Sequence, residues 1–407
     1  MKRITKLLMV ITALMLMATM FTACGRDDDD PDRPIRIGAI TSLSGALQDF
    51  GEQFQRGFNL GLEYMTNGTN QVAGRDIQVI WEDTTNTPDV ARERTMVLLE
   101  THNVDIVTGF ASSGDAMASL ALFEEFETVA VIEPAAADFI IQYPNWNEFI
   151  FRTGRTSAQD ALALAAVLGG MHPGGGRTVA ALAPDSTFGH SMVDPFRPAV
   201  EALGFTWVGA EMAPEAATDF SPFILRLREL APDYLYVIWA GANSPWVQLL
   251  ELDLEGVGTT IITGAPQREA LEAMRELGQI GGFGFCVYYP TLPQNVPMND
   301  WMVRRHMEDF GFAADIFTSG GFAAASAIIT ALELTGGDTD SRVLIDTMRG
   351  MQFDSPTGVR YFRREDHQAM QPLFAIEFSY SPTHLVPLYV RTIPSHEITP
   401  EIMNRRP

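Results

Sequence analysis

The chain has 407 residues, of which 46% are hydrophobic and 10% aromatic, which suits two packed domains of ordinary size. Asp and Glu number 51 against 28 Lys and Arg, so the formal net charge is −23. This acidity favours solubility, and the lack of a long basic run argues against nucleic acid as a partner.

The first 24 residues have the pattern of a secretory signal. A basic start precedes an apolar run over residues 7–21, which is too short for a comfortable membrane span, and small residues lead to Cys24. A cysteine at this point resembles the lipobox of bacterial lipoproteins, although Phe21 stands where that pattern usually has Leu. We therefore expect a signal peptide over residues 1–24 and a lipidated Cys24. An uncleaved anchor and a soluble secreted form are the alternatives.

Residues 25–33 contain four consecutive Asp and a Pro, and like charges keep such a segment extended. Because this run lacks the Gly and the spaced ligands of a calcium loop, we interpret it as an acidic tether. With Cys24 lipidated, Cys286 is the one remaining thiol, which excludes an intrachain disulfide. The apolar sequence around Cys286 predicts that it is buried.

Strand and helix patterns alternate through the first third of the chain. Strands are expected over residues 35–40, 77–82, 104–107 and 129–132, and helices over residues 52–66, 89–101 and 113–127. Strand, crossover helix, strand is a βαβ unit, whose strands are parallel. The alternation predicts a doubly wound sheet.

After residues 149–155 a second alternation begins. Strands are expected over residues 178–183, 206–210, 234–239 and 260–263, and helices over residues 158–168, 191–203, 222–230 and 245–254. Helices over residues 299–310, 320–335 and 341–349 follow, and strands over residues 353–362 and 372–390 end the chain. The fold class is therefore α/β with two lobes.

Two loops that follow neighbouring first-lobe strands form the candidate ligand site. They are residues 110–113 (FASS) and residues 134–137 (PAAA). Ligands bind at the carboxyl ends of the strands in open α/β sheets, and the helix N-terminus beside Ser113 favours a negative group. The alternative is that Ser112 and Ser113 only cap the helix, with Asp115 completing a capping box, and that the alanines only turn the chain.

Enzyme signatures are not recognisable in the sequence. Residues 189–193 (GHSMV) lack the final Gly of a nucleophile elbow, and the Gly-rich segment before Thr178 lacks the P-loop Lys. The seven His residues have no paired-ligand spacing, and we interpret His367 as part of a surface turn. The sequence predicts a protein that is not an enzyme and has no catalytic residue, metal or cofactor.

Five motifs, in order, carry a resemblance to a known family. They are IRIGAITSLSGALQDFGEQFQRGFNLGLEYMTNG (35–68), VDIVTGFASS (104–113), EPAAAD (133–138), FRTGR (151–155) and GVRYFRREDHQ (358–368). With the lipobox-like signal before them, they resemble the type I extracytoplasmic solute-binding proteins of ABC transporters. The group includes the leucine/isoleucine/valine-binding proteins, and the similarity covers nearly all of residues 34–390.

This resemblance implies two doubly wound lobes joined by three hinge crossings, with the ligand in the cleft between them. The crossings are expected near residues 152–154, 285–289 and 353–358. The implied division is residues 34–153 plus 287–354 for the first lobe, residues 154–286 plus 355–393 for the second lobe, and residues 394–407 for a tail. The resemblance also implies an extracytoplasmic protein, lipid-anchored to the cell membrane, whose partners are a small molecule and ABC permease subunits.

The family pattern also implies positions for ligand contacts. In the first lobe, Phe50 matches an aromatic residue that covers the ligand, and the two loops match segments that hold its carboxylate. In the second lobe, Trp239 and Gly241 fall where the family has a ligand-contacting Tyr. Gln267 falls where the amino-acid binders have a Glu for the ammonium. The expected ligand contacts are Phe50, Ala111, Ser112, Ser113, Ala135, Ala136, Ala137, Trp239, Gly241 and Gln267.

Three residues near the expected site have a purely structural role as the alternative to a role in the cleft. Phe50 is either a ligand wall or a core residue, and Trp239 is either a ligand contact or packing between the lobes. Arg155, just past a crossing, is either a surface ion pair or a cleft residue.

Because this chain has Gln267 where the amino-acid binders have a Glu, the chemical class of the ligand stays open. A buried ammonium requires an acidic partner. The candidates are Asp115, Asp138, Asp160 and Asp185. We expect a small amino acid of the branched-chain type or a close relative, captured for an ABC importer. The alternatives are a small amide, an aromatic or aliphatic carboxylate without an amine, or a ligand-sensing role.

Overall fold

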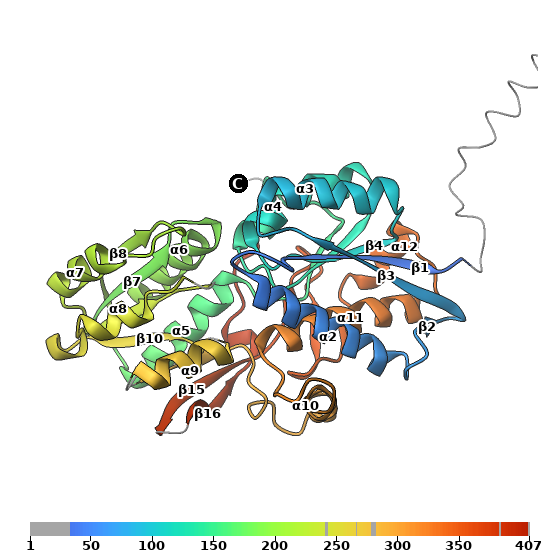
Figure 1. Cartoon of the computed structure of the whole chain (residues 1–407). Helices are drawn as coiled ribbons and strands as arrows, with labels where there is room; N and C mark the ends of the chain where they lie inside the picture. The colour runs from blue at the N-terminus through green and yellow to red at the C-terminus, as the bar shows by residue number, and fades with distance from the viewer. Residues whose placement is uncertain (1–32, 241–242, 266, 278–281, 382–383, 406–407) are drawn as a thin grey trace, which may run out of the picture.

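The computed structural model describes residues 33–240, 243–265, 267–277, 282–381 and 384–405. Two α/β lobes lie side by side, each built around its own sheet, as the sequence predicts (Figure 1). The first third of the chain and a late segment make one lobe, and the middle of the chain makes most of the other.

The first-lobe sheet has six strands in the order β2-β3-β1-β4-β5-β6. They are β1 (Ile35–Thr41), β2 (Gln71–Val72), β3 (Arg75–Asp83), β4 (Ile106–Gly109), β5 (Val129–Ile132) and β6 (Ile150–Arg152). Every pair except β2–β3 is parallel. Strands such as β5, buried along their whole length, are apolar throughout because helices cover both faces. The strand order reverses between β1 and β4, which places a ligand crevice at their carboxyl ends.

Helices cover the two faces of this sheet. They are α2 (Gln48–Met65), α3 (Pro88–Met96) with a π-helical extension (Val97–Thr101), α4 (Ser113–Glu125), a 3-10 turn (Asp138–Ile141), α10 (Pro297–Phe310), α11 (Ile316–Leu334) and α12 (Ser341–Met348). Helices α3 and α4 lie on one face, and α2 and α11 on the other (Figure 1). By length and composition α11 is apolar enough to cross a membrane, but most of it is buried in the first lobe, as a core helix is.

The second-lobe sheet has seven strands in the order β16-β15-β11-β10-β9-β7-β8. They are β7 (Thr178–Pro184), β8 (Thr206–Ala213), β9 (Tyr234–Val237), β10 (Thr260–Gly264), β11 (Phe283–Cys286), β15 (Leu373–Ser381) and β16 (His384–Ile393). The strands up to β11 are parallel, and the hairpin β15–β16 is antiparallel. Cys286 is buried, as predicted.

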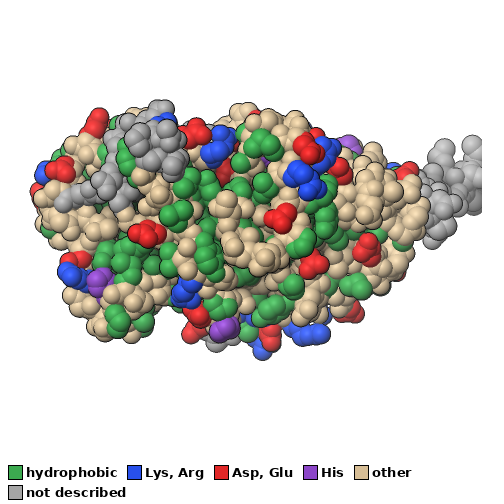
Figure 2. Space-filling view, turned by 90° about the horizontal axis from the view of Figure 1, so that it is seen from below, with side chains coloured by type: hydrophobic (Ala, Val, Ile, Leu, Met, Phe, Trp, Pro, Cys, Tyr) green, Lys and Arg blue, Asp and Glu red, His purple; other side chains and the backbone are tan. Residues whose placement is uncertain are grey.

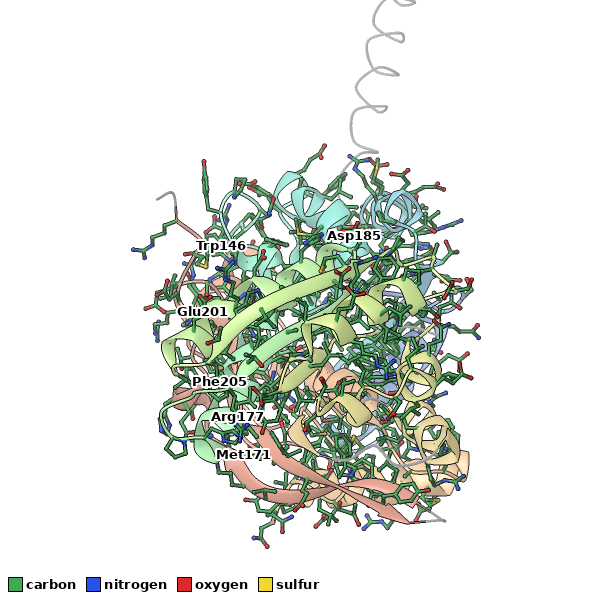
Figure 3. All side chains as sticks on the ribbon, turned by 90° about the vertical axis from the view of Figure 1, so that its left-hand side faces the viewer. Trp146, Met171, Arg177, Asp185, Glu201 and Phe205 are labelled. Carbon is green, nitrogen blue, oxygen red and sulfur yellow. The ribbon has the colours of Figure 1, made fainter. Side chains whose placement is uncertain are left out.

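The second-lobe helices connect these parallel strands. They are α5 (Ser157–Met171), α6 (Thr187–Ala202), α7 (Ser221–Leu230), α8 (Trp246–Glu251), a 3-10 turn (Glu255–Val257) and α9 (Arg268–Leu277). Arg177 and Asp185 flank the two ends of β7, so Asp185 marks the carboxyl edge of this sheet (Figure 3). Seen from below, acidic and basic side chains are scattered over the face and do not gather into one charged patch (Figure 2).

The chain passes between the lobes three times, and the third passage differs from expectation. A small sheet of β12 (Gln352–Phe353), β13 (Arg360–Phe362) and β14 (Ala369–Met370) precedes β15. Phe362 and Ala369 belong to the first-lobe core, so the crossing lies after Met370 and not at residues 353–358. The expected boundary at residues 354 and 355 is therefore wrong.

A tight turn explains this difference. The Ser355 N–H donates to the Gly358 carbonyl at 3.1 Å, and the Gly358 N–H donates to the Ser355 carbonyl at 2.9 Å. Gly358 takes a φ of +106°, which L-residues rarely adopt. The single strand expected over residues 353–362 is thus a hairpin that folds back onto the first lobe.

The three crossings meet at a small cavity of about 10 Å³. Its lining includes Arg155, Val287 and Gln371, one residue from each crossing. The tail also returns to the first lobe, where the Tyr143 N–H donates to the Met403 carbonyl at 2.7 Å.

His367 is not in a surface turn as expected. Its ring is fully buried and stacks on Phe151 with centroids 4.1 Å apart. Its Nδ1 lies 3.1 Å from the Ile150 carbonyl oxygen, and burial lowers the pKa of the imidazole to about 4. The polar residues around His367 form buried ion pairs, such as that between Arg363 and Asp366. A polar stretch of sequence suggests exposure, so the burial could not be predicted from it.

Candidate functional site

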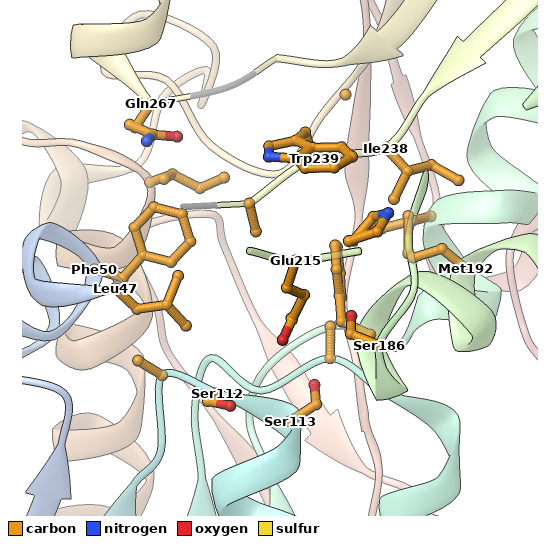
Figure 4. A pocket seen from close by; sticks show the side chains of 18 of the residues that line it. Leu47, Phe50, Ser112, Ser113, Ser186, Met192, Glu215, Ile238, Trp239 and Gln267 are labelled. Atoms are coloured by element: carbon orange, nitrogen blue, oxygen red, sulfur yellow. The ribbon is translucent and has the colours of Figure 1, made fainter. Parts of the chain in front are cut away.

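A cavity of about 380 Å³ lies between the lobes and is lined by both of them (Figure 4). It opens at the carboxyl ends of the strands, where the sequence predicted a site. The predicted residues that line it are Phe50, Ala111, Ser112, Ser113, Ala136, Trp239 and Gln267. Gly241 lies outside the described residues.

The N-terminus of α4 forms the first-lobe side of the cavity. Ser112 is its N-cap, and the Ser112 Oγ accepts a hydrogen bond from the Asp115 N–H at 3.3 Å. The Ser113 Oγ accepts from the Ala137 N–H at 3.1 Å. Both serines therefore hold the loop together, and each hydroxyl still has a proton that it can donate to a ligand oxygen.

The second loop contributes less than expected. The Ala135 N–H donates to the Phe110 carbonyl at 3.0 Å, and the Ala137 N–H donates to Ser113. Ala135 and Ala137 are buried and are not among the residues that line the cavity. Their backbone N–H groups are bonded within the first lobe. Among the described residues of this loop, only Ala136 lines the cavity.

Two aromatic side chains, one from each lobe, line the cavity. Phe50, on α2, packs against Phe317 with ring centroids 4.2 Å apart, so it is both core and cavity lining. Trp239 follows β9 and packs edge-on against Phe220 at 4.9 Å. Its indole N–H donates to the Asn243 carbonyl, which holds the ring in place. Figure 4 shows Gln267 to the left of Trp239 and above Phe50.

A buried ion pair lies at the second-lobe base of the cavity. Arg155 and Asp160 both line it, with the Arg155 Nε 3.2 Å from the Asp160 Oδ2. A second Arg155 nitrogen donates to the Pro134 carbonyl at 3.3 Å. Burial raises the pKa of Asp160 to about 6, against the opposing effect of Arg155. Beside the pair is Tyr236, another lining residue, whose pKa is raised by burial and by the charge of Asp160.

Of the four candidate acids, Asp160 is the one that lines the cavity among the described residues. Asp115 is buried in the first turn of α4, and Asp138 accepts the Ala158 N–H at 3.2 Å. Asp185 is exposed and bonds His190 at 2.8 Å.

Glu215 is a lining residue that the sequence reasoning missed. It follows β8, and its carboxylate extends into the cavity toward Ser112 and Ser113 (Figure 4). Its position just after a second-lobe strand is a signal that points to the cleft side. That signal is weak, because several loops share it.

Comparisons with known proteins agree with this geometry. The periplasmic binding protein family model matches residues 34–381. A solved structure from Rhodopseudomonas palustris CGA009, described as an ABC-type branched-chain amino acid transporter, is 36% identical, with a TM-score of 0.79; the match covers 91% of this chain and 100% of that one. Leu/Ile/Val-binding protein homolog 6 of Brucella abortus is 23% identical over 84% of this chain and 87% of that protein.

A more distant structure shares the fold. An R. palustris solute binding protein in complex with 4-hydroxybenzoate is 21% identical, with a TM-score of 0.79, over 89% of this chain and 97% of that chain. The family match spans most of the sequence, and the two-lobed fold with its interlobe cavity agrees with it. This chain therefore belongs to the periplasmic binding protein family, and it is a binding protein and not an enzyme.

Proposed function

We propose that this chain is the extracytoplasmic solute-binding component of an ABC importer. It captures a small amino acid, or a close relative of one, and delivers it to the permease subunits. The observation that carries this proposal is the cavity of about 380 Å³ between the lobes. Its volume falls in the range of roughly 300–1,000 Å³ of typical ligand pockets. Relatives described as branched-chain amino acid transporters and Leu/Ile/Val-binding homologs support the ligand class.

The cavity offers an anion site on its first-lobe side. The hydroxyls of Ser112 and Ser113 lie at the N-terminus of α4, where the helix dipole favours negative charge. A ligand carboxylate there would receive hydroxyl donors and the favourable effect of the helix dipole, against the opposing negative charge of Glu215. Phe50 and Trp239 provide flat apolar walls for a hydrocarbon side chain.

A second candidate ligand class is an aromatic or aliphatic carboxylate, or a small amide. The observation that favours it is the neutral Gln267, which stands where a Glu was expected for an ammonium. Solved relatives of the same fold carry benzoates.

A thermal-shift panel on the purified protein separates the two classes. The panel holds leucine, isoleucine, valine, other amino acids, small amides and benzoate. We expect stabilisation by at least one amino acid, since a ligand at 100 times its Kd adds about 2.7 kcal/mol to the free energy of unfolding. Stabilisation by benzoate or an amide, with none by any amino acid, would overturn the first choice.

We further propose that Cys24 carries the lipid that anchors the protein outside the cytoplasm. The support is the basic, apolar and small-residue order of residues 1–24, which lie outside the described part of the chain. Growth with a labelled fatty acid should label the wild-type protein and not the Cys24→Ser variant. A variant that stays labelled would contradict the anchor.

A further inference from the structure

We infer that the ligand of this cavity carries a cationic nitrogen, and that Asp160 binds it with help from Tyr236. The inference rests on the proposed solute-binding function and adds the chemical group by which the second lobe recognises its ligand. The inference places the ammonium at Asp160, whereas the family pattern implies that the residue at position 267 binds it.

The first observation is an unused oxygen on Asp160. The Asp160 Oδ2 lies 3.2 Å from Arg155, whereas the Oδ1 accepts no hydrogen bond from any residue that the structure describes. The residue is 1% exposed and yet lines the cavity. A buried carboxylate oxygen without a donor is costly, and an N–H group of a ligand would satisfy it.

The second observation is the balance of charge around the cavity. Its charged lining residues, among those described, are Arg155, Asp160 and Glu215. Arg155 is already bonded to Asp160 and to the Pro134 carbonyl. By this pairing one acid, Glu215, remains in excess among the described lining residues. A ligand with a carboxylate and no amine would add a second uncompensated negative charge, whereas a zwitterion adds no net charge and brings an ammonium that can pair with an acid of the cavity.

The third observation is how the two ends of the site are placed. Ser112 and Ser113 belong to the first lobe and Asp160 to the second, so one zwitterion can contact both lobes. Asp160 is held firmly because a capping box between Thr156 and Gln159 fixes the first turn of α5. A fixed carboxylate loses little entropy when it binds an ammonium.

Calorimetric titration with three matched probes tests the inference on the wild-type protein. Leucine has both charged groups, 4-methylpentanoate lacks the amine, and 3-methylbutylamine lacks the carboxylate. If leucine does not bind, the amino acid that stabilises most in the panel above replaces it, with its own two analogues. We expect the loss of the amine to weaken binding roughly 10- to 100-fold. Equal binding of the amine-free probe would overturn the inference and leave the transport role standing. If no small molecule in the panel binds, the proposed function fails as well.

Three substitutions locate the effect. Asp160→Asn should lower the ratio of leucine to 4-methylpentanoate affinity roughly tenfold or more, and Tyr236→Phe should lower it less. Asp185→Asn, which changes an exposed acid outside the cavity, should leave the ratio unchanged. Because the ratio compares two ligands on the same protein, a general loss of stability does not mimic the result. An unchanged ratio in Asp160→Asn would overturn the assignment.

Discussion

Ser112 both caps α4 and lines the cavity, and these two contributions can be separated. Ser112→Ala removes the cap, which should lower the free energy of unfolding by about 1 kcal/mol. It should also weaken ligand binding by about 1–3 kcal/mol if a buried carboxylate loses a donor. Urea unfolding and calorimetry measure the two effects.

The matched control is Ser112→Asp, because Asp caps a helix as well as Ser does. This variant should keep its stability and lose ligand affinity, since a carboxylate would face the ligand's own. Unchanged affinity in both variants would show that Ser112 is merely a cap.

Asp115 makes stability depend on pH. Burial raises its pKa to about 6, against the opposing effect of the nearby Thr84 and Ser112 hydroxyls. Because the pKa is higher in the folded chain than in the unfolded one, the folded state binds the proton more tightly. The contribution of Asp115 to stability is therefore lost as pH rises from about 4 to about 6.

Asp115→Asn should raise the free energy of unfolding at pH 8, by up to about 3 kcal/mol, and change it little at pH 4. Thermal unfolding at the two pH values checks this. Asp89→Asn is the control, since Asp89 is exposed in the first turn of α3. An equal effect in both variants would contradict the buried-charge explanation.

At the scale of elements, glycines allow α2 and α11 to pack closely. A Cβ on Gly57 would lie 1.9 Å from the Thr318 carbonyl oxygen, and one on Gly321 would lie 2.2 Å from the Phe54 carbonyl oxygen. Gly57→Ala should therefore destabilise the first lobe by about 1–3 kcal/mol, measured by urea unfolding.

Gly170→Ala is the matched control on a helix. Gly170 is exposed near the end of α5, and an added Cβ there would meet nothing within 4 Å. Its substitution should stabilise the protein by roughly 0.5–1 kcal/mol, because Ala is the better helix former. Opposite signs for the two variants are the expected outcome, and similar values would argue against close packing of α2 on α11.

At the scale of the whole molecule, the lobes touch through a hydrogen bond beside the cavity. The Asp138 N–H of the first lobe donates to the Ser191 Oγ of the second at 2.7 Å. A ligand that contacts both lobes favours the closed arrangement by its differential affinity. We expect ligand to reduce the radius of gyration in X-ray scattering, and Ser191→Ala to increase it without ligand.

Ser119→Ala is the control for this prediction. Ser119 is also a buried serine, and its hydroxyl bonds Thr95 within the first lobe at 3.1 Å. Its loss should leave the radius of gyration unchanged. A radius that responds neither to ligand nor to Ser191→Ala would indicate a rigid cleft.

The sequence by itself determined the two α/β lobes and the family, and it predicted a site at the carboxyl ends of the strands, where the structure has a cavity. These features depend on patterns within a few residues, such as the wholly apolar β5 and the capping serine before α4. Such features can be predicted because the hydrophobic periods of helices and strands repeat over neighbouring positions.

Only the tertiary structure decided which charges meet in the cavity and where the chain crosses for the third time. Asp160 and Ser112 lie on different lobes, and Phe362 is first-lobe core although it follows a turn. His367 is buried within a polar stretch because Phe151, more than 200 positions earlier, stacks on it. Contacts between segments that are distant in the sequence have no period along the chain, so a local pattern cannot predict them.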